Sequence, residues 1–282
     1  MGIALAAAQL LAEERKARPF SGSALLFGRQ DLAFRLPDLA RWAEERGAPL
    51  APLEGRGDAA LFHALGFADV TALDASDFEG AEIVHDLNRP IPEALRGRFD
   101  LVFNGGTLEH VFDVAGALRN VSDLLRVGGR AIHIAPVSNQ IDHGFYSFSP
   151  TLLYDWATAN EWTIHTAYVF QMRDWESPWT VYEYVPGAFD PISSRFHEVR
   201  VSGITLAGLF FVLEKGSSST GDRIPQQGAY RRAWDTAAAP PAPVDAAEKK
   251  TKNALRDWKR KLDRATPIFN ERPMPRKVGR YG

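Results

Sequence analysis

Two histidines, each placed after an apolar run, carry the side chain best suited to taking up a proton. His143 lies in the loop NQIDHGFYSFSP beside Asp142 and Tyr146, and His110 lies in FDLVFNGGTLEHVFD. An imidazole titrates near neutral pH, so either residue could act as a general base toward a poor nucleophile such as a hydroxyl group. The competing interpretation is structural, with His110 as a capping or packing residue and Tyr146 as cover for a sheet edge. We take His143, His110 and Tyr146 as the candidate catalytic residues.

The elements that must position these residues alternate between strand and helix. An apolar run at 101–103 stops at the polar turn Asn104-Gly105-Gly106-Thr107, and a helical pattern then ends at Gly128-Gly129 before a second apolar run. This spacing is typical of parallel strands joined by a crossover helix. Ligands of such sheets bind at the carboxyl ends of the strands, so the turn at 104–107 is expected to face a ligand.

The same alternation extends over most of the chain and predicts a doubly wound α/β sheet. A helix is predicted from Ser149, a suitable N-cap that is followed by Pro150. Two late strands, at 163–172 and 204–216, are expected to form an antiparallel pair at the edge, separated by an aromatic-rich insertion at 175–196. The other predicted strands lie at 23–29, 70–76, 81–88 and 132–139, and the other predicted helices at 37–47, 59–65 and 114–125.

Composition excludes several classes of function. The chain has 282 residues, of which 45% are hydrophobic, and it has no cysteine, so disulfides, thiolate metal sites and a cysteine nucleophile are ruled out. The apolar stretch at the N-terminus turns charged at Glu13, which indicates an amphipathic helix instead of a signal peptide or membrane span. We expect a cytoplasmic protein with no membrane span and no nucleic-acid partner.

Charge divides the chain unevenly. Residues 249–282 hold twelve Lys or Arg against three acids, a net charge of +9 that leaves −11 on residues 1–248. This basic tail either contacts an anionic partner, folds back on the acidic body, or is simply solvated. We divide the chain into an N-terminal helix (1–20), a main domain (21–235) and a proline-rich linker with a basic helical tail (236–282). A homo-oligomer is left open.

These motifs resemble class I S-adenosylmethionine-dependent methyltransferases over roughly residues 20–216. The segment FDLVFNGGTLEHVFD, the pair Gly128-Gly129 and the strand IHIAPVSN carry the resemblance. It implies a doubly wound, mostly parallel seven-stranded sheet of Rossmann-like type, here with a C-terminal helical extension. It also implies S-adenosylmethionine as cofactor and transfer of a methyl group to a small-molecule or glycan acceptor.

The resemblance assigns cofactor-binding positions. Asp74 would accept hydrogen bonds from the two ribose hydroxyls, with Ala75 beside it, because a carboxylate can serve two donors at once. Asp86 would take the adenine amino group, and the backbone of Leu87 would meet the edge of the ring. The turn containing Asn104, Gly105 and Gly106 would lie beneath the methionine part. The competing interpretation is that Asp74 and Asp86 each only cap a turn.

The first loop departs from the family pattern. Where further glycines are expected, LLFGRQD keeps only Gly28 and has Arg29 and Gln30 instead. Either Arg29 or Gln30 contacts the methionine carboxylate of the cofactor, or the protein does not bind the cofactor. Together with PQQGAYRRAW and HGFYSFSPTLLYDW, the GRQ loop resembles an uncharacterised methyltransferase subgroup associated with polysaccharide biosynthesis, for which GRQ would be the normal form.

Acids and histidines near the strand ends raise the question of a metal site. None of them forms the His-x-x-x-His pair that places two ligands on one helix face, so we predict no metal, although some sugar O-methyltransferases use a divalent ion. The residues concerned are His85, Asp86, His110, Asp113, Asp142 and His143.

Two functions of different classes follow from the sequence. The first is a methyltransferase acting on a small polar acceptor such as a sugar hydroxyl. The alternative is a catalytically inactive methyltransferase-like binding or assembly subunit, which the altered first loop favours. A nicotinamide oxidoreductase is disfavoured, because GRQDLA does not supply Gly-x-Gly-x-x-Gly.

Overall fold

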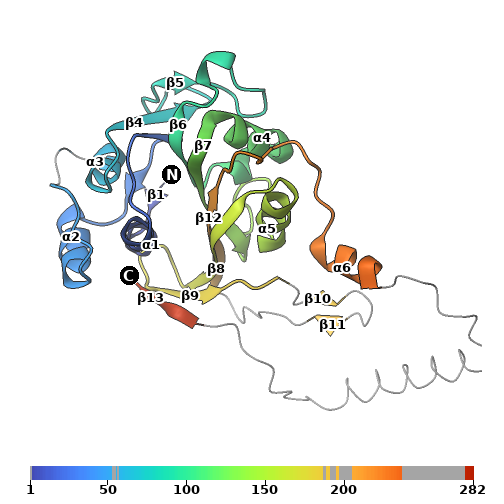
Figure 1. The fold of residues 1–282 in the computed structure, drawn as a ribbon. Helices are drawn as coiled ribbons and strands as arrows, with labels where there is room; N and C mark the ends of the chain where they lie inside the picture. The colour runs from blue at the N-terminus through green and yellow to red at the C-terminus, as the bar shows by residue number, and fades with distance from the viewer. Residues whose placement is uncertain are drawn as a thin grey trace, which may run out of the picture.

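A mixed β-sheet with helices on both faces organises the chain (Figure 1). The computed structural model describes residues 2–52, 55, 57–186, 189–190, 195–196, 205–236 and 277–282. Within these residues the sheet has nine strands in the order β5-β4-β2-β6-β7-β12-β8-β9-β13. In chain order they are β2 (Ser23–Phe27), β4 (Asp69–Asp74), β5 (Ile83–Val84), β6 (Phe99–Gly105), β7 (Leu125–Ser138), β8 (Thr163–Met172), β9 (Trp179–Glu183), β12 (Leu206–Glu214) and β13 (Lys277–Tyr281).

The helices and the remaining short elements lie outside this sheet. Two small sheets pair β1 (Gly2–Ile3) with β3 (Asp31–Leu32) and β10 (Phe189–Asp190) with β11 (Arg195–Phe196). The helices are α1 (Leu5–Ala17), α2 (Leu36–Glu45), α3 (Gly57–Ala64), α4 (Val114–Leu124), α5 (Pro150–Ala159) and α6 (Gly228–Thr236), with 3-10 turns η1 (Glu93–Leu95) and η2 (Leu108–His110).

The strand order confirms the predicted α/β class and corrects the predicted sheet. Strands β5, β4, β2, β6 and β7 are parallel, as expected. The sheet is not seven-stranded, because β9 and β13 extend it beyond β8. Strands β8 and β12 form the predicted antiparallel pair, but β12 lies inside the sheet between β7 and β8 instead of at its edge. From β2 the chain builds outward to β4 and β5, then returns to β6 on the other side, which creates a topological switch point between β2 and β6.

Two hydrophobic layers hold the helices against the sheet. Because side chains alternate along a strand, Leu101 and Phe103 of β6 pack on one face while Val102 packs on the other. The first face is covered by α1, α2 and α3 and the second by α4 and α5, which lie on opposite sides of the sheet in Figure 1. Phe103 meets Phe62 of α3 edge to face, with ring centroids 5.1 Å apart.

A buried ion pair fixes the N-terminal helix to the sheet. Arg130 of β7 contacts Glu14 of α1 at 2.8 Å and donates to the carbonyls of Arg18 and Pro19. Its guanidinium also lies 4.3 Å from the centroid of the Phe20 ring. Glu14 is further paired with Arg18, so the buried carboxylate has two cationic partners. The predicted N-terminal helix is therefore attached to β7 by a buried ion pair.

Residues Lys277–Tyr281 form strand β13. The sequence analysis expected this segment to belong to a basic helical tail. Strand β13 pairs with β9 and contacts α1, and the N–H of Gly282 donates to Gln9 Oε1 at 2.7 Å. The predicted proline-rich linker at 236–247 begins at the last residue of α6, Thr236, and the rest of it lies outside the described residues, as does the predicted helix at 248–264. Most of the basic segment therefore stays a prediction.

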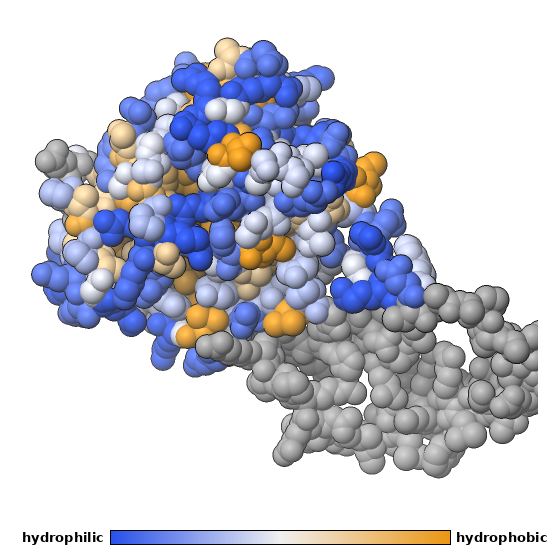
Figure 2. Space-filling view, in the orientation of Figure 1, coloured by the Kyte–Doolittle hydropathy of each residue, from blue (hydrophilic) through white to orange (hydrophobic). Residues whose placement is uncertain are grey.

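The surface seen in Figure 2 is largely hydrophilic, with hydrophobic side chains exposed in scattered small groups. Among the helices that the structure describes, none combines the length and the apolar character needed to cross a membrane.

Candidate functional site

The parallel strands bring the predicted site residues to one edge of the sheet. Phe27, the last residue of β2, pairs with Leu73 of β4 on one side and with Asn104 of β6 on the other. The segments that follow these strands therefore start at the same level. The N–H of Gly28 donates to the Leu73 carbonyl at 2.8 Å, and its φ of +73° is one that glycine adopts without strain.

Gln30 fills the space between the first loop and β6. Its side chain is buried, and Nε2 donates to the carbonyl of Phe27 at 3.1 Å, while its backbone N–H donates to Asp58 of α3 at 2.9 Å. Gln30 Oε1 has no hydrogen-bond partner among the described residues and lies against Gly105, where a Cβ would come within 2.7 Å of it. The loop can close on β6 in this way because position 105 lacks a side chain.

Arg29 is held by carboxylates of the protein itself. It pairs with Asp58 at 3.3 Å and with Glu82, whose other oxygen accepts the N–H of Ala72 at 2.7 Å. Its guanidinium therefore ties the first loop to α3 and to the segment before β5.

Asp74 and Asp86 retain acceptor capacity at the ends of β4 and β5. Asp74 is half-buried. Among the described residues, its carboxylate accepts one hydrogen bond, a long one of 3.4 Å from the N–H of Ser76. Ala75 beside it is exposed. Exposed Asp86 accepts the N–H and the amide of Asn88 on a single oxygen, at 2.9 and 2.7 Å. The hydrogen bond from the Asn88 backbone holds the pKa of Asp86 below its usual value.

Asn120 of α4, which the sequence analysis did not single out, shapes the loop after Asp86. The side chain is 3% exposed and donates to the carbonyls of Leu87 at 3.0 Å and Arg89 at 2.8 Å. Its oxygen accepts the N–H of Ile91 at 3.2 Å. The sequence signal was a polar residue next to the apolar stripe of an amphipathic helix, a position where a polar side chain needs partners.

Hydrogen bonds between two side chains and the backbone stabilise the turn after β6. Asn104 Oδ1 accepts the N–H groups of Thr107 and Leu108 at 2.9 and 3.0 Å, and Thr107 Oγ1 donates to the Phe27 carbonyl at 2.6 Å. The Asn104 side chain is buried, and through these two hydrogen bonds it stabilises the turn. Gly105 and Gly106 leave the backbone of the turn free of side chains toward the sheet edge.

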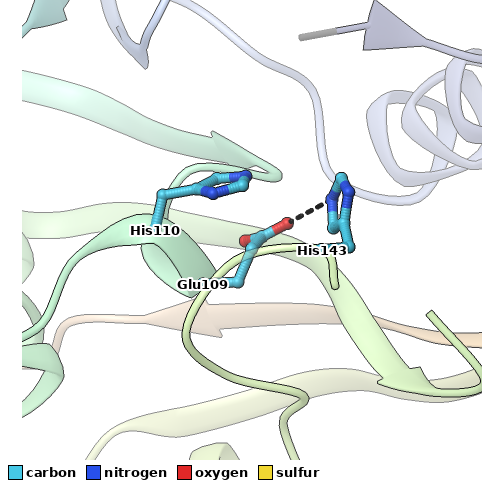
Figure 3. Close-up of side chains that lie close together, drawn as sticks. All are labelled: Glu109, His110 and His143. Atoms are coloured by element: carbon cyan, nitrogen blue, oxygen red, sulfur yellow. Dashed lines mark ion pairs between the residues drawn. The ribbon is translucent and has the colours of Figure 1, made fainter. Parts of the chain in front are cut away.

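Glu109, His110 and His143 come together beside this turn (Figure 3). The Glu109 side chain is 1% exposed, and its Oε1 lies 3.6 Å from His143 Nε2. Glu109 Oε2 has no hydrogen-bond partner among the described residues. One ligand-type atom from each of the three residues lies within 4.8 Å of the others. The spacing is compatible with a metal ion, a grouping that the sequence analysis did not predict.

Burial dominates the electrostatics of this cluster. Desolvation raises the pKa of Glu109 to about 7. The pKa of His110 is lowered by desolvation and, secondarily, by the charge of His143. The two imidazole rings meet edge to face with centroids 5.2 Å apart.

The loop after β7 places His143 by attaching itself to Glu109. The N–H groups of Phe145 and Tyr146 donate to the Glu109 carbonyl at 2.7 and 3.2 Å. Gly144 has a φ of +78°, and a Cβ there would lie 2.7 Å from the same carbonyl oxygen. The Tyr146 hydroxyl donates to the carbonyl of Phe112 at 2.9 Å, so the third candidate catalytic residue braces the loop.

No family model and no curated protein matches this chain. Among solved structures it is similar to a Bacillus halodurans protein assigned as a methyltransferase, with 10% identity over 73% of this chain and 99% of that one and a TM-score of 0.42. It is also similar to the 1,6-didemethyltoxoflavin-N1-methyltransferase of Burkholderia thailandensis, which was solved with S-adenosylhomocysteine. That match has 16% identity over 75% and 80% of the two chains and a TM-score of 0.37. Both likenesses are too distant to argue from, so we argue function from the residues of this chain.

Proposed function

We propose that the protein is an S-adenosylmethionine-dependent methyltransferase that methylates a hydroxyl group of a small polar acceptor, with sugars and glycans as the acceptor class. One observation carries the proposal. At the switch point between β2 and β6, glycine-bearing turns, two carboxylates with spare acceptor capacity and a cluster able to take a proton share one sheet edge.

The nucleoside half of the cofactor fits the residues after β4 and β5. Asp74 has both oxygens available for the two ribose hydroxyls, apart from its long contact with Ser76. Asp86 keeps one oxygen for the adenine amino group. Because Asn120 occupies the Leu87 carbonyl, the Leu87 N–H is the backbone group left for the ring edge.

The methionine half would lie over the turns at 28–30 and 104–107. Gly28, Gly105 and Gly106 allow close approach of the backbone. Since Arg29 already has Asp58 and Glu82 as partners, we assign Arg29 and Gln30 to holding the loop in shape, in preference to binding the methionine carboxylate directly.

The chemistry is an in-line displacement. The acceptor oxygen forms a bond to the methyl carbon as the bond between that carbon and the sulfonium breaks, which leaves S-adenosylhomocysteine and a methyl ether. The hydroxyl proton passes to a base, for which His143 is the candidate and His110 the second choice. His143 is 42% exposed on the acceptor side and has the Glu109 carboxyl behind it, which can stabilise the imidazolium.

Calorimetric titration with S-adenosylmethionine tests the proposal. We expect micromolar-range binding and, in Asp74→Ala, a loss of about 1–3 kcal/mol, or roughly 5- to 150-fold in Kd, because ribose hydroxyls lose their acceptor. The matched control is Asp77→Ala, which removes an exposed carboxylate three residues away. Absence of heat at millimolar cofactor would refute the proposal and favour the inactive binding or assembly subunit.

A further inference from the structure

We propose that Glu109, His110 and His143 form a binding site for one divalent first-row transition-metal ion, of which Zn²⁺ is the best fit. The ligands are one carboxylate oxygen and two imidazole nitrogens, which leave at least one coordination position open. Neither the ion nor this site is needed for cofactor binding. The inference therefore does not rest on the proposed function.

The first observation behind the proposal is the spacing of the ligand atoms. Zinc bonds to imidazole nitrogen and carboxylate oxygen at about 2.0–2.2 Å, so two ligands of one ion lie about 3.3 Å apart at a tetrahedral angle and about 4 Å apart when opposite. The Glu109 Oε1 to His143 Nε2 distance of 3.6 Å falls in that range. The widest separation in the cluster is within 4.8 Å, and both histidines are exposed enough to close it by a small side-chain rotation.

The second observation behind the proposal is a buried carboxylate oxygen that lacks a hydrogen bond. Glu109 has a side chain 1% exposed, and its Oε2 has no hydrogen-bond partner in the described part of the chain. In Figure 3 its carboxyl group lies between the two imidazole rings. A buried carboxylate is destabilising unless it is protonated or all of its charge is compensated, and here His143 faces only one of the two oxygens. A cation held between Glu109 and the two imidazoles would remove that cost.

The donor types narrow the choice of ion. Two neutral imidazoles and one carboxylate are the ligand set of catalytic zinc sites and of related iron sites. Mg²⁺ and Ca²⁺ prefer oxygen ligands and would find one carboxylate here. The ligands come from two segments, η2 and the loop at 139–148, which the hydrogen bonds from Phe145 and Tyr146 to the Glu109 carbonyl hold together.

An ion at this position would change the role of His143. Its nitrogen lone pair would then be used in coordination, and the open position would take water or the acceptor hydroxyl. A metal ion lowers the pKa of a bound hydroxyl or water, so it would take over the task assigned to the base in the metal-free protein.

Direct metal titration tests this site without any activity assay. Tag-free full-length protein is stripped with a chelator and titrated by calorimetry with Zn²⁺ and by visible absorbance with Co²⁺, whose spectrum reports nitrogen and oxygen coordination. We expect one ion per chain with micromolar or tighter affinity for Zn²⁺, and no heat with Mg²⁺. Two variants remove a ligand. Glu109→Gln keeps the shape of the side chain, and His143→Ala changes an exposed residue, so we expect both variants to fold. Circular dichroism would verify this. Each should weaken Zn²⁺ binding at least about 100-fold.

The matched control is His165→Ala. His165 forms another His–Glu pair, 2.9 Å from Glu214, but has no third ligand within the described residues and should leave Zn²⁺ affinity unchanged. Equal Zn²⁺ affinity in wild type, Glu109→Gln and His143→Ala, or no Zn²⁺ binding in the wild type, would overturn the proposal. Titrating the same preparations with S-adenosylmethionine separates the two ideas, since loss of the metal site alone leaves cofactor binding intact.

Discussion

Mild acid should destabilise this protein through one buried histidine, His133 in the centre of β7. The side chain is fully buried, and neither ring nitrogen has a hydrogen-bond partner among the described residues. It faces the layer beneath α4 and α5, where it lines a cavity of ≈ 10 Å³ with Asn104 and apolar side chains. Burial lowers the pKa of His133 from 6.5 to about 4, because a charged imidazole would lose its water there.

The sign and size of the effect follow from linkage. In the unfolded chain His133 takes up a proton near pH 6.5, whereas in the folded protein it does so only near pH 4. The stability contributed by the neutral ring is therefore complete above pH 6.5, falls as pH drops from 6.5 toward 4, and changes no further below 4. At pH 5 the free energy of unfolding is lowered by about 2 kcal/mol. This follows because pH 5 lies roughly 1.5 pH units below the pKa of the unfolded state, and each pH unit contributes ~1.4 kcal/mol.

Urea unfolding of wild type and His133→Leu at pH 7.5 and pH 5 measures this loss. Leucine has a similar volume and no titratable group, and all other groups titrate in both proteins. The free energy of unfolding of the wild type should fall between the two pH values by about 2 kcal/mol more than that of the variant. If both proteins lose the same stability, His133 is not held neutral by burial and the reasoning is refuted.

Two further predictions concern residues that hold the site in place. Asn120→Ala should lower stability by about 1–3 kcal/mol, because it strands the carbonyls of the loop after Asp86, and should weaken S-adenosylmethionine binding. Calorimetry and urea unfolding would check this, and unchanged cofactor affinity would contradict the positioning role. Gly144→Ala should cost more stability than Gly47→Ala: both have positive φ, but only Gly144 has a backbone oxygen 2.7 Å from the new Cβ, and position 47 has open space. Equal midpoints in urea would show that the loop shifts freely.

Much of the fold could be predicted because its elements have strong local signals. The N-cap at Ser149 is confirmed, since its hydroxyl accepts the N–H of Thr151 at 3.3 Å at the start of α5. The buried parallel strands β2, β6 and β7 could be found as short apolar runs bounded by turn residues. Strand β13 could not be found in this way. Its sequence KVGRY is charged and contains a glycine, and it is a strand only because β9 offers an edge to pair with.

The order of the strands depends on contacts that are remote in sequence. Strand β12 has the apolar composition of a buried strand, which is why it was expected, but composition does not distinguish an edge from an interior position. Its place between β7 and β8 is set by pairing with residues 34 to 84 positions earlier, from Leu206 with Met172 to Glu214 with Arg130. The same holds for the polar residues of the site. The positions of Asp74 and Asp86 at the strand ends could be predicted from local sequence, and their cofactor role stays a prediction. The inward orientation of Asn104 and the hydrogen bond from Tyr146 to Phe112 depend on folded neighbours.

The Glu109–His110–His143 cluster shows why the spacing rule used in the sequence analysis did not group these residues. The rule considers ligands on one helix face, and His143 is separated from His110 by α4 and the whole of β7. The three side chains meet because the chain reverses after β7 through Asn139 and Asp142, which have positive φ, and then approaches Glu109 closely at Gly144. The loop after β7 reaches the turn after β6 at Gly144, where a Cβ would lie 2.7 Å from the carbonyl oxygen of Glu109, four residues after β6 ends. This glycine therefore allows the two loops to meet in one site. The test is a crystal structure and a Zn²⁺ titration of Gly144→Ala. If the loop has moved but Zn²⁺ affinity is unchanged, the close approach of Gly144 to the Glu109 carbonyl does not determine the cluster.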